Sequence, residues 1–251
     1  MRQVLKDQEV GLDPKFRYRG LNQTRIETFS DTAFALAITL LVLSSSVPET
    51  FTELKESMGS VLPFGICISL IAVIWYQHYV FFIRYGLQNA RTVILNIILL
   101  FLILVYVYPL KYLARFLVAY YSTLFNGDWQ GLQAEFGDLF IESGGNLSYL
   151  MVMYGLGVVS IFFTLAAMYH HAYRQKEALA LDEYEIFTTK ASRLMNILQG
   201  SVAVLSVLIA GIAPFGKVSP IVAGFVYMLY PIILPIAGVR LARKRKQLLG
   251  E

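Results

Sequence analysis

Charge and cysteine are both scarce in this chain of 251 residues. Asp, Glu, Lys and Arg make up 15% of the sequence, while 57% of the residues are hydrophobic. A soluble domain of this length usually carries more charge and fewer apolar residues, so we expect the lipid bilayer to be the solvent. The single cysteine, Cys67, excludes an intrachain disulfide. The net charge of +4 is small, and we expect no nucleic-acid partner.

Motifs of metal-dependent enzymes and of common hydrolases are also missing. The three histidines are His78 and the adjacent pair His170 and His171, and no HExxH or GxSxG arrangement occurs. The adjacent pair is interpreted as interfacial. We therefore expect no enzymatic activity, no metal site and no cofactor.

The sequence does contain six long apolar runs. A membrane-spanning helix needs about 20 apolar residues. The runs cover about residues 26–47, 61–83, 92–114, 147–169, 194–214 and 218–239. We therefore predict an all-α membrane protein whose six-span unit covers residues 21–240. A basic tail at 1–20, interpreted as a solvated or lipid-facing arm, and a basic tail at 241–251 flank this unit.

Positive charge is distributed unequally between the two sides of the predicted membrane. Of the 21 lysines and arginines, 17 lie at the termini and in the turns after the second and fourth spans. The other four are Lys55, Lys111, Arg115 and Lys217. The positive-inside rule therefore predicts that both termini are cytoplasmic, in agreement with an even number of spans. The expected location is the cell membrane.

The segments between the spans allow three further predictions. The third apolar run continues past Pro109, so its helix is expected to project from the membrane unless Lys111 and Arg115 extend to the interface. Residues 122–146 are interpreted as a polar, glycine-rich outer loop, and residues 174–190 as a connector. Prolines in the last span predict a kinked helix.

The first span carries an unusual number of polar residues for so apolar a segment. In "RIETFSDTAFALAITLLVL", Arg25 to Leu43, an Arg, a Glu, a Ser and an Asp fall within the first two helical turns. At about 100° per residue, one stripe of this helix contains Phe29, Thr32, Leu36, Leu40 and Leu43, with Thr39 at its flank. Glu27, Asp31 and Ile38 lie on the opposite side. A carboxylate facing lipid costs several kcal/mol, so Asp31 is expected to face protein or water.

Partners for the polar side chains of the first span lie at a similar depth. Trp75 and His78 are near the cytoplasmic end of the second span, and Asn96 is near the start of the third. Together with Ser30 and Asp31, their donors and acceptors can form a closed set of hydrogen bonds. Taken alone, Trp75 is equally consistent with an interfacial belt residue. For His78, an interhelical histidine with satisfied hydrogen bonds is favoured over a metal ligand or a proton relay. We predict that the cluster fixes the first helix.

These residues resemble a known signature. Arg25-x-x-x-Phe29-Ser30-Asp31, opening the first of six spans, resembles the R-x-x-x-F-S-D motif of the lysosomal potassium channel family called transmembrane protein 175, in its prokaryotic branch. "WYQHY" in the second span and "LNIILLFLILVYVYPL" in the third are similar to accompanying patterns of that family. The resemblance covers about residues 21–115.

The resemblance implies a potassium-conducting cation channel that assembles as a homotetramer in the bilayer. In the family, the first helix of each subunit lines the central pore, and rings of bulky apolar residues form its constriction. Carried over, these rings are Leu36, Leu40 and Leu43, with Thr39 contributing to selectivity. Arg25, Phe29, Ser30 and Asp31 form the structural motif, and its charged and polar members would hold the helix in place. Arg25 falls near the pore stripe in angle, and its partner could be Asp31, Glu27 or a carbonyl. Permeant potassium ions would be the only ligands.

Selectivity for potassium would then have to arise without the carbonyl filter of the familiar potassium channels. The TVGYG filter sequence is missing, and no re-entrant loop is apparent between any two spans. Thr39 hydroxyls could replace part of an ion's hydration shell, although Thr39 could instead bond only to its own helix. The main alternative is a proton- or cation-coupled secondary transporter that uses Asp31 and His78, but the sequence shows neither inverted repeats nor broken midplane helices.

Overall fold

The computed structural model of the chain is built from α-helices and short 3-10 turns. It describes residues 13–43, 49–59, 61–140 and 145–249. The helices are α1 (Arg25–Leu43), α2 (Phe51–Gly59), α3 (Val61–Tyr85), α4 (Ala90–Asn126), α5 (Trp129–Phe136), α6 (Gly145–Arg174), α7 (Glu183–Ile212), α8 (Ser219–Val226) and α9 (Tyr230–Leu249). The 3-10 turns are η2 (Gly137–Leu139), η4 (Gly216–Val218) and η5 (Tyr227–Leu229).

Within the described ranges, six helical segments are long and apolar enough to cross a bilayer, which confirms the predicted six-span fold and makes the chain a multi-pass membrane protein. These segments are Arg25–Leu43, Val61–Tyr85, Ala90–Val107, Asn146–Arg174, Glu183–Ile212 and Gly216–Arg245. The last is divided: α8 and α9 are separated by η5, and Pro235 lies inside α9.

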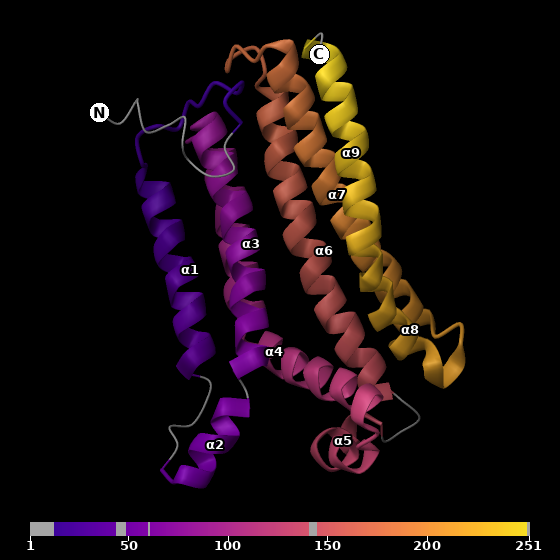
Figure 1. The fold of residues 1–251 in the computed structure, drawn as a ribbon. Helices are drawn as coiled ribbons and strands as arrows, with labels where there is room; N and C mark the ends of the chain where they lie inside the picture. The colour runs from indigo at the N-terminus through magenta and orange to yellow at the C-terminus, as the bar shows by residue number, and fades with distance from the viewer. Residues whose placement is uncertain (1–12, 44–48, 60, 141–144, 250–251) are drawn as a thin grey trace.

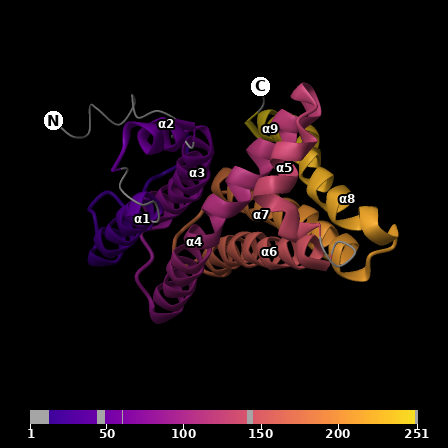
Figure 2. The same cartoon turned by 90° about the horizontal axis from the view of Figure 1, so that it is seen from below.

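The helices form two groups joined by α4. In Figures 1 and 2, α1 and α3 stand on one side and α6 to α9 on the other, with α4 running between them. One core cluster packs α1, α3, α6 and the first part of α4, and a second packs α5, α6, α7 and α8 against the second part of α4. The long helix α4 thus contributes to both cores.

Two connecting segments differ from their predicted form. The region expected to be an outer loop, 122–146, contains the end of α4, all of α5 and the η2 turn, while its residues 141–144 lie outside the described residues. Leu132 and Phe136 of α5 are buried against Phe116 of α4, and this contact orders a segment whose polar composition indicated a loop. Gly127, at φ 73°, ends α4.

The connector predicted at 174–190 is helical from Glu183 onward. Asp182 and Glu185 form a reciprocal capping box that starts α7 eleven residues before the predicted span at 194. The helix therefore begins with about three turns that contain charges of both signs, and a search for apolar runs does not include them in a span.

The N-terminal strap, residues 13–20 of the tail interpreted as a solvated or lipid-facing arm, is packed against the helices through part of its side chains. Phe16 is 2% exposed and makes an edge contact with the Tyr85 ring. The amides of Arg19 and Gly20 donate to the carbonyls of Arg84 and Ile83, at 3.3 and 3.0 Å. A Cβ at Gly20 would lie 2.2 Å from the carbonyl oxygen of Phe82, so the close approach requires glycine. Residues 1–12 of the predicted tail lie outside the described residues.

Candidate functional site

Helix α1 has one buried face and one exposed face. Ser30, Phe34, Ala37 and Leu41 are buried against α3 and α4. The opposite face is exposed over two turns and more; its members are Thr28, Phe29, Thr32, Ala35, Leu36, Thr39, Val42 and Leu43. Among the residues that the structure describes, a long apolar and hydroxyl-bearing face of one helix is therefore left without a packing partner.

The residues predicted to line a pore are distributed unevenly on this face. Leu36 and Leu43 are 48% and 71% exposed. Leu40 is partly buried and packs against the core, as does Ile38. Thr39 is exposed, and its hydroxyl donates to the Ala35 carbonyl at 2.9 Å.

A buried chain of hydrogen bonds joins α1, α3 and α4. The Asn96 amide nitrogen donates to Ser30 Oγ at 2.9 Å, and its Oδ1 lies 2.8 Å from His78 Nε2. Because Oδ1 can only accept, His78 must carry its proton on Nε2. Ser30 in turn donates to the Ile26 carbonyl at 2.8 Å. All three side chains are at most 1% exposed, so the chain ties three helices together at one depth.

Asp31 lies at the exposed edge of this cluster. Its two carboxylate oxygens accept from Trp75 Nε1 at 2.9 Å and from Gln23 Nε2 at 3.1 Å. The cluster of Ser30, Asp31, Trp75, His78 and Asn96 therefore comes together in two parts, one buried and one exposed. Gln23 precedes the first span, and no spacing signal in the sequence indicates its role.

The other two residues of the signature, Arg25 and Phe29, do not take part in this cluster. Arg25 and Phe29 are exposed, and within the described residues Arg25 makes no hydrogen bond or ion pair. Glu27 accepts from the Thr24 hydroxyl at 2.8 Å and from the Thr24 amide at 3.2 Å, so it closes a capping box at the start of α1. The T-x-x-E pattern at 24–27 is the sequence signal for this role, and the sequence analysis missed it.

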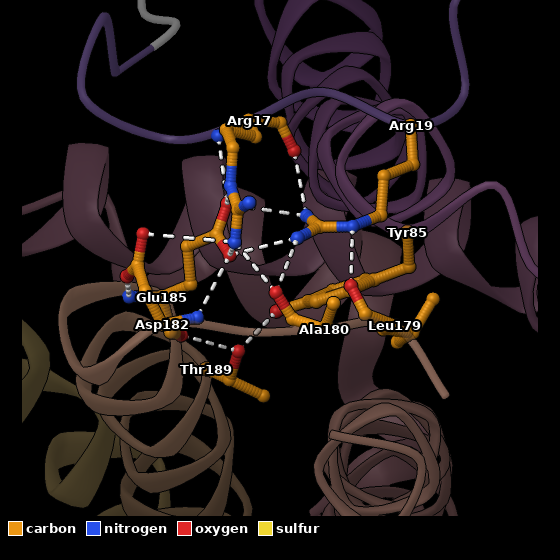
Figure 3. A network of polar contacts seen from close by, with 8 residues as sticks. All are labelled: Arg17, Arg19, Tyr85, Leu179, Ala180, Asp182, Glu185 and Thr189. Carbon is orange, nitrogen blue, oxygen red and sulfur yellow. Dashed lines mark hydrogen bonds and ion pairs between the residues drawn. The ribbon is translucent and has the colours of Figure 1, made fainter. Parts of the chain in front are cut away.

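A second polar cluster connects the N-terminal strap to the start of α7 (Figure 3). The Glu185 carboxylate is fully buried and forms ion pairs with Arg17 and Arg19 at 2.9 and 2.7 Å. It also accepts from the Arg17 amide at 2.8 Å. The hydrogen bond from Arg17 to Glu185 raises the pKa of the guanidinium above its usual value. Arg19 donates to the Leu179 carbonyl as well, which holds the strap on the turn between α6 and α7.

A metal-binding set is not evident in this geometry. Within the ranges that the structure describes, no three His, Cys, Asp or Glu side chains are placed to hold an ion together. The polar side chains of the Ser30–Asn96 cluster bond to one another, to Gln23 and to the Ile26 carbonyl, and these bonds tie α1 to α3 and α4.

Comparison with known proteins agrees with the signature in α1. The profile of the family described as "Endosomal/lysosomal potassium channel TMEM175" matches residues 25–107. A protein of Marivirga tractuosa named "Potassium channel" is 52% identical over 243 residues, which cover 96% of this chain and 97% of that one. A potassium channel of Chamaesiphon minutus is 34% identical over 104 residues, 38% of this chain and half of that one.

A solved structure extends the likeness to the whole fold. It is the crystal structure of a threonine-to-alanine variant of the potassium channel MtTMEM175 in complex with a nanobody–MBP fusion protein. Its chain is 51% identical to this one, covers 93% of it and superposes with a TM-score of 0.83. Identity at this level over almost the full length of both chains cannot arise from shared hydropathy alone, and the chain therefore belongs to the TMEM175 family.

Proposed function

We propose that this protein is a potassium-conducting cation channel. The proposal is supported by the names of its relatives, each of which is called a potassium channel. The observation that carries it in this chain is the exposed face of α1. Three threonines, Thr28, Thr32 and Thr39, lie on a face that is otherwise apolar. Their hydroxyls donate to carbonyls one turn earlier, at 2.9 to 3.1 Å, and each oxygen keeps a lone pair that can accept from water in a pore.

The pore is proposed to form between subunits. A single α1 cannot enclose an ion path, so several copies must arrange their exposed faces around an axis, and a closed homotetramer meets this need. Multi-angle light scattering of the purified protein should give a tetrameric protein mass. A monomeric mass together with intact ion flux would contradict the assembly.

The constriction is proposed to consist of leucine rings. Leu36 and Leu43 are the most exposed leucines of α1, and Leu40 lies between them along the helix. Rings of leucine provide no oxygen for an ion and close a narrow pore by excluding water. Opening then requires the α1 helices to rotate or separate. Thr39 is proposed to supply hydroxyls to a partly dehydrated ion in the open pore.

The orientation follows from the charge asymmetry of the sequence. Both the N-terminal strap and the end of α9 lie at one end of the molecule, where Asp13 pairs with Arg245 at 3.2 Å. We propose that this end faces the cytoplasm and that the protein resides in the cell membrane.

The test compares two faces of α1. Potassium and sodium flux is measured in proteoliposomes for Leu36→Ala and for Ile38→Ala, a matched control that removes a similar side chain from the packed face. Leu36→Ala should increase the leak several-fold, and Ile38→Ala should not. Thr39→Ala should lower the preference for potassium without increasing the leak. A leak from Ile38→Ala but not from Leu36→Ala would overturn the pore assignment.

A further experiment separates a channel from a transporter. The alternative transporter would use Asp31 and His78 as its coupling site, but both side chains are occupied by hydrogen bonds to Trp75 and Asn96. Recordings from a reconstituted planar bilayer should show single-channel current steps. Flux without such steps, together with strict coupling to protons, would favour the transporter.

A further inference from the structure

A cavity lies between α3, α6, α7 and α9, toward the end of the molecule that carries the strap. Its volume is about 330 Å³, at the lower end of the range found for ligand sites. All of its lining residues belong to segments long and apolar enough to span a membrane. Val80, Phe187, Met195 and Leu241 give it apolar walls, and Arg84 and Arg245 supply cationic groups.

Unsatisfied polar atoms gather in this cavity. In the part of the chain that the structure describes, four buried side-chain polar atoms lack a hydrogen-bond partner, and three of them belong to lining residues. They are Arg84 Nε, Thr188 Oγ1 and Asn196 Oδ1. Thr188 and Asn196 are 6% and 2% exposed. Buried polar groups without partners are rare because each costs free energy. The Tyr184 and Tyr169 side chains approach Thr188 and Arg84, so Asn196 Oδ1 and Arg84 Nε are the atoms that most clearly point to a polar ligand here.

A ligand of this cavity must offer both a hydrogen-bond acceptor and a hydrogen-bond donor to these three atoms. Arg84 donates to Ser192 Oγ at 3.2 Å through its terminal nitrogen, which leaves its Nε–H free for an acceptor. The Asn196 amide nitrogen donates to the Ser192 carbonyl, so its oxygen must be the free atom. Thr188 and Asn196 lie one helical turn on either side of Ser192, about 6 Å each way. A ligand there must accept from Arg84 and donate to Asn196.

The charge around the cavity favours an anion. Among the described residues, no ion pair involves Arg84. Arg245 is neutralised by Asp13 at 3.2 Å, so Arg84 is the cation left for a ligand. Arg240, Arg243 and Lys244 are exposed on the same end of α9 and would draw anionic headgroups toward it.

We propose that this cavity binds an anionic phospholipid whose headgroup carries free hydroxyls. Its phosphate oxygens accept from Arg84 and Thr188, a headgroup hydroxyl donates to Asn196, and its acyl chain contacts the apolar walls. The site lies away from the exposed face of α1, and the proposal does not depend on channel activity. Phosphatidylglycerol has the required chemistry, and glycerol phosphate is its soluble counterpart.

The test counts bound lipids by native mass spectrometry of the purified full-length protein. Phosphatidylglycerol and phosphatidylcholine are added in equal amounts, first alone and then with excess glycerol phosphate. The wild-type protein should retain one phosphatidylglycerol per subunit in preference to phosphatidylcholine. Arg84→Gln should weaken this binding at least about tenfold, because the lost hydrogen bond is charge-assisted. Lys217→Gln, which removes one exposed charge in the η4 turn outside the cavity lining, should leave it unchanged.

Thr188→Val keeps the side-chain shape and removes only the hydroxyl, so it tests the site even if Arg84→Gln impairs folding. It should reduce retention of phosphatidylglycerol but not of phosphatidylcholine. Equal retention of the two lipids, or equal loss in Arg84→Gln and Lys217→Gln, would overturn the proposal. Displacement of the lipid by glycerol phosphate would assign the site to a soluble phosphate ester and overturn the lipid assignment.

Discussion

Removing Asn96 tests how firmly the buried hydrogen-bond chain holds α1. Asn96→Leu keeps most of the side-chain volume but removes both contacts that join α1, α3 and α4. Ser30 retains its bond to the Ile26 carbonyl, so its loss is small. His78, in contrast, is left with an Nε2 proton and no acceptor at 1% exposure.

The expected loss of stability depends mainly on the unpaired His78 imidazole, because Ser30 keeps a hydrogen-bond partner. A buried donor without a partner costs about 1–3 kcal/mol. Hydrogen bonds between membrane helices average only about 0.6 kcal/mol, because partners are also available in the unfolded state within the membrane. We therefore expect Asn96→Leu to lower the free energy of unfolding by about 1–3 kcal/mol, most of it from the orphaned imidazole.

A second substitution, at His78, tests whether the unpaired imidazole causes the loss of stability. His78 lies among aromatic rings, with centroids of Phe82 and Phe34 at 4.6 and 5.6 Å, so phenylalanine fits its surroundings. The double variant His78→Phe/Asn96→Leu removes both partners and should recover a large part of the lost stability. Unfolding in mixed micelles titrated with sodium dodecyl sulfate measures the cycle. If the loss of unfolding free energy in the double variant equals the sum of the losses in the two single variants, the unpaired imidazole is not the cause of the destabilisation.

Two further predictions concern the N-terminal strap. Glu185→Gln keeps the side-chain shape but removes the charge that holds Arg17 and Arg19. Trypsin should therefore cleave after these arginines several-fold faster. An unchanged cleavage rate would show that Glu185 does not hold the strap in place. Gly20→Ala forces a Cβ onto the Phe82 carbonyl and should lower the free energy of unfolding by about 1–3 kcal/mol in the same denaturation assay. The control is Gly65→Ala, where a Cβ meets no atom within 4 Å, and it should leave stability equal or higher.

The sequence by itself determined the class of protein and the position of its spans. In a bilayer each backbone polar group must be satisfied within its own segment, so a run of about 20 apolar residues is a helix whatever surrounds it. The polar set around α1 was also predictable, because helical periodicity fixes the face of Ser30, and the order of the spans fixes the depth of His78 and Asn96. The T-x-x-E cap at 24–27 was equally local, although it was overlooked.

Only the tertiary structure decided the rest. Glu185 accepts from an arginine 168 residues earlier in the chain, and nothing in its charged neighbourhood indicates which carboxylate is buried. The helical form of α5 depends on Phe136 meeting Phe116, and the enclosure of Leu40 on how α1 rests against the core. The cavity beside Arg84 exists only where α3, α7 and α9 converge. Each of these features depends on contacts between distant segments, and such contacts have no period or spacing that a single stretch of sequence can display.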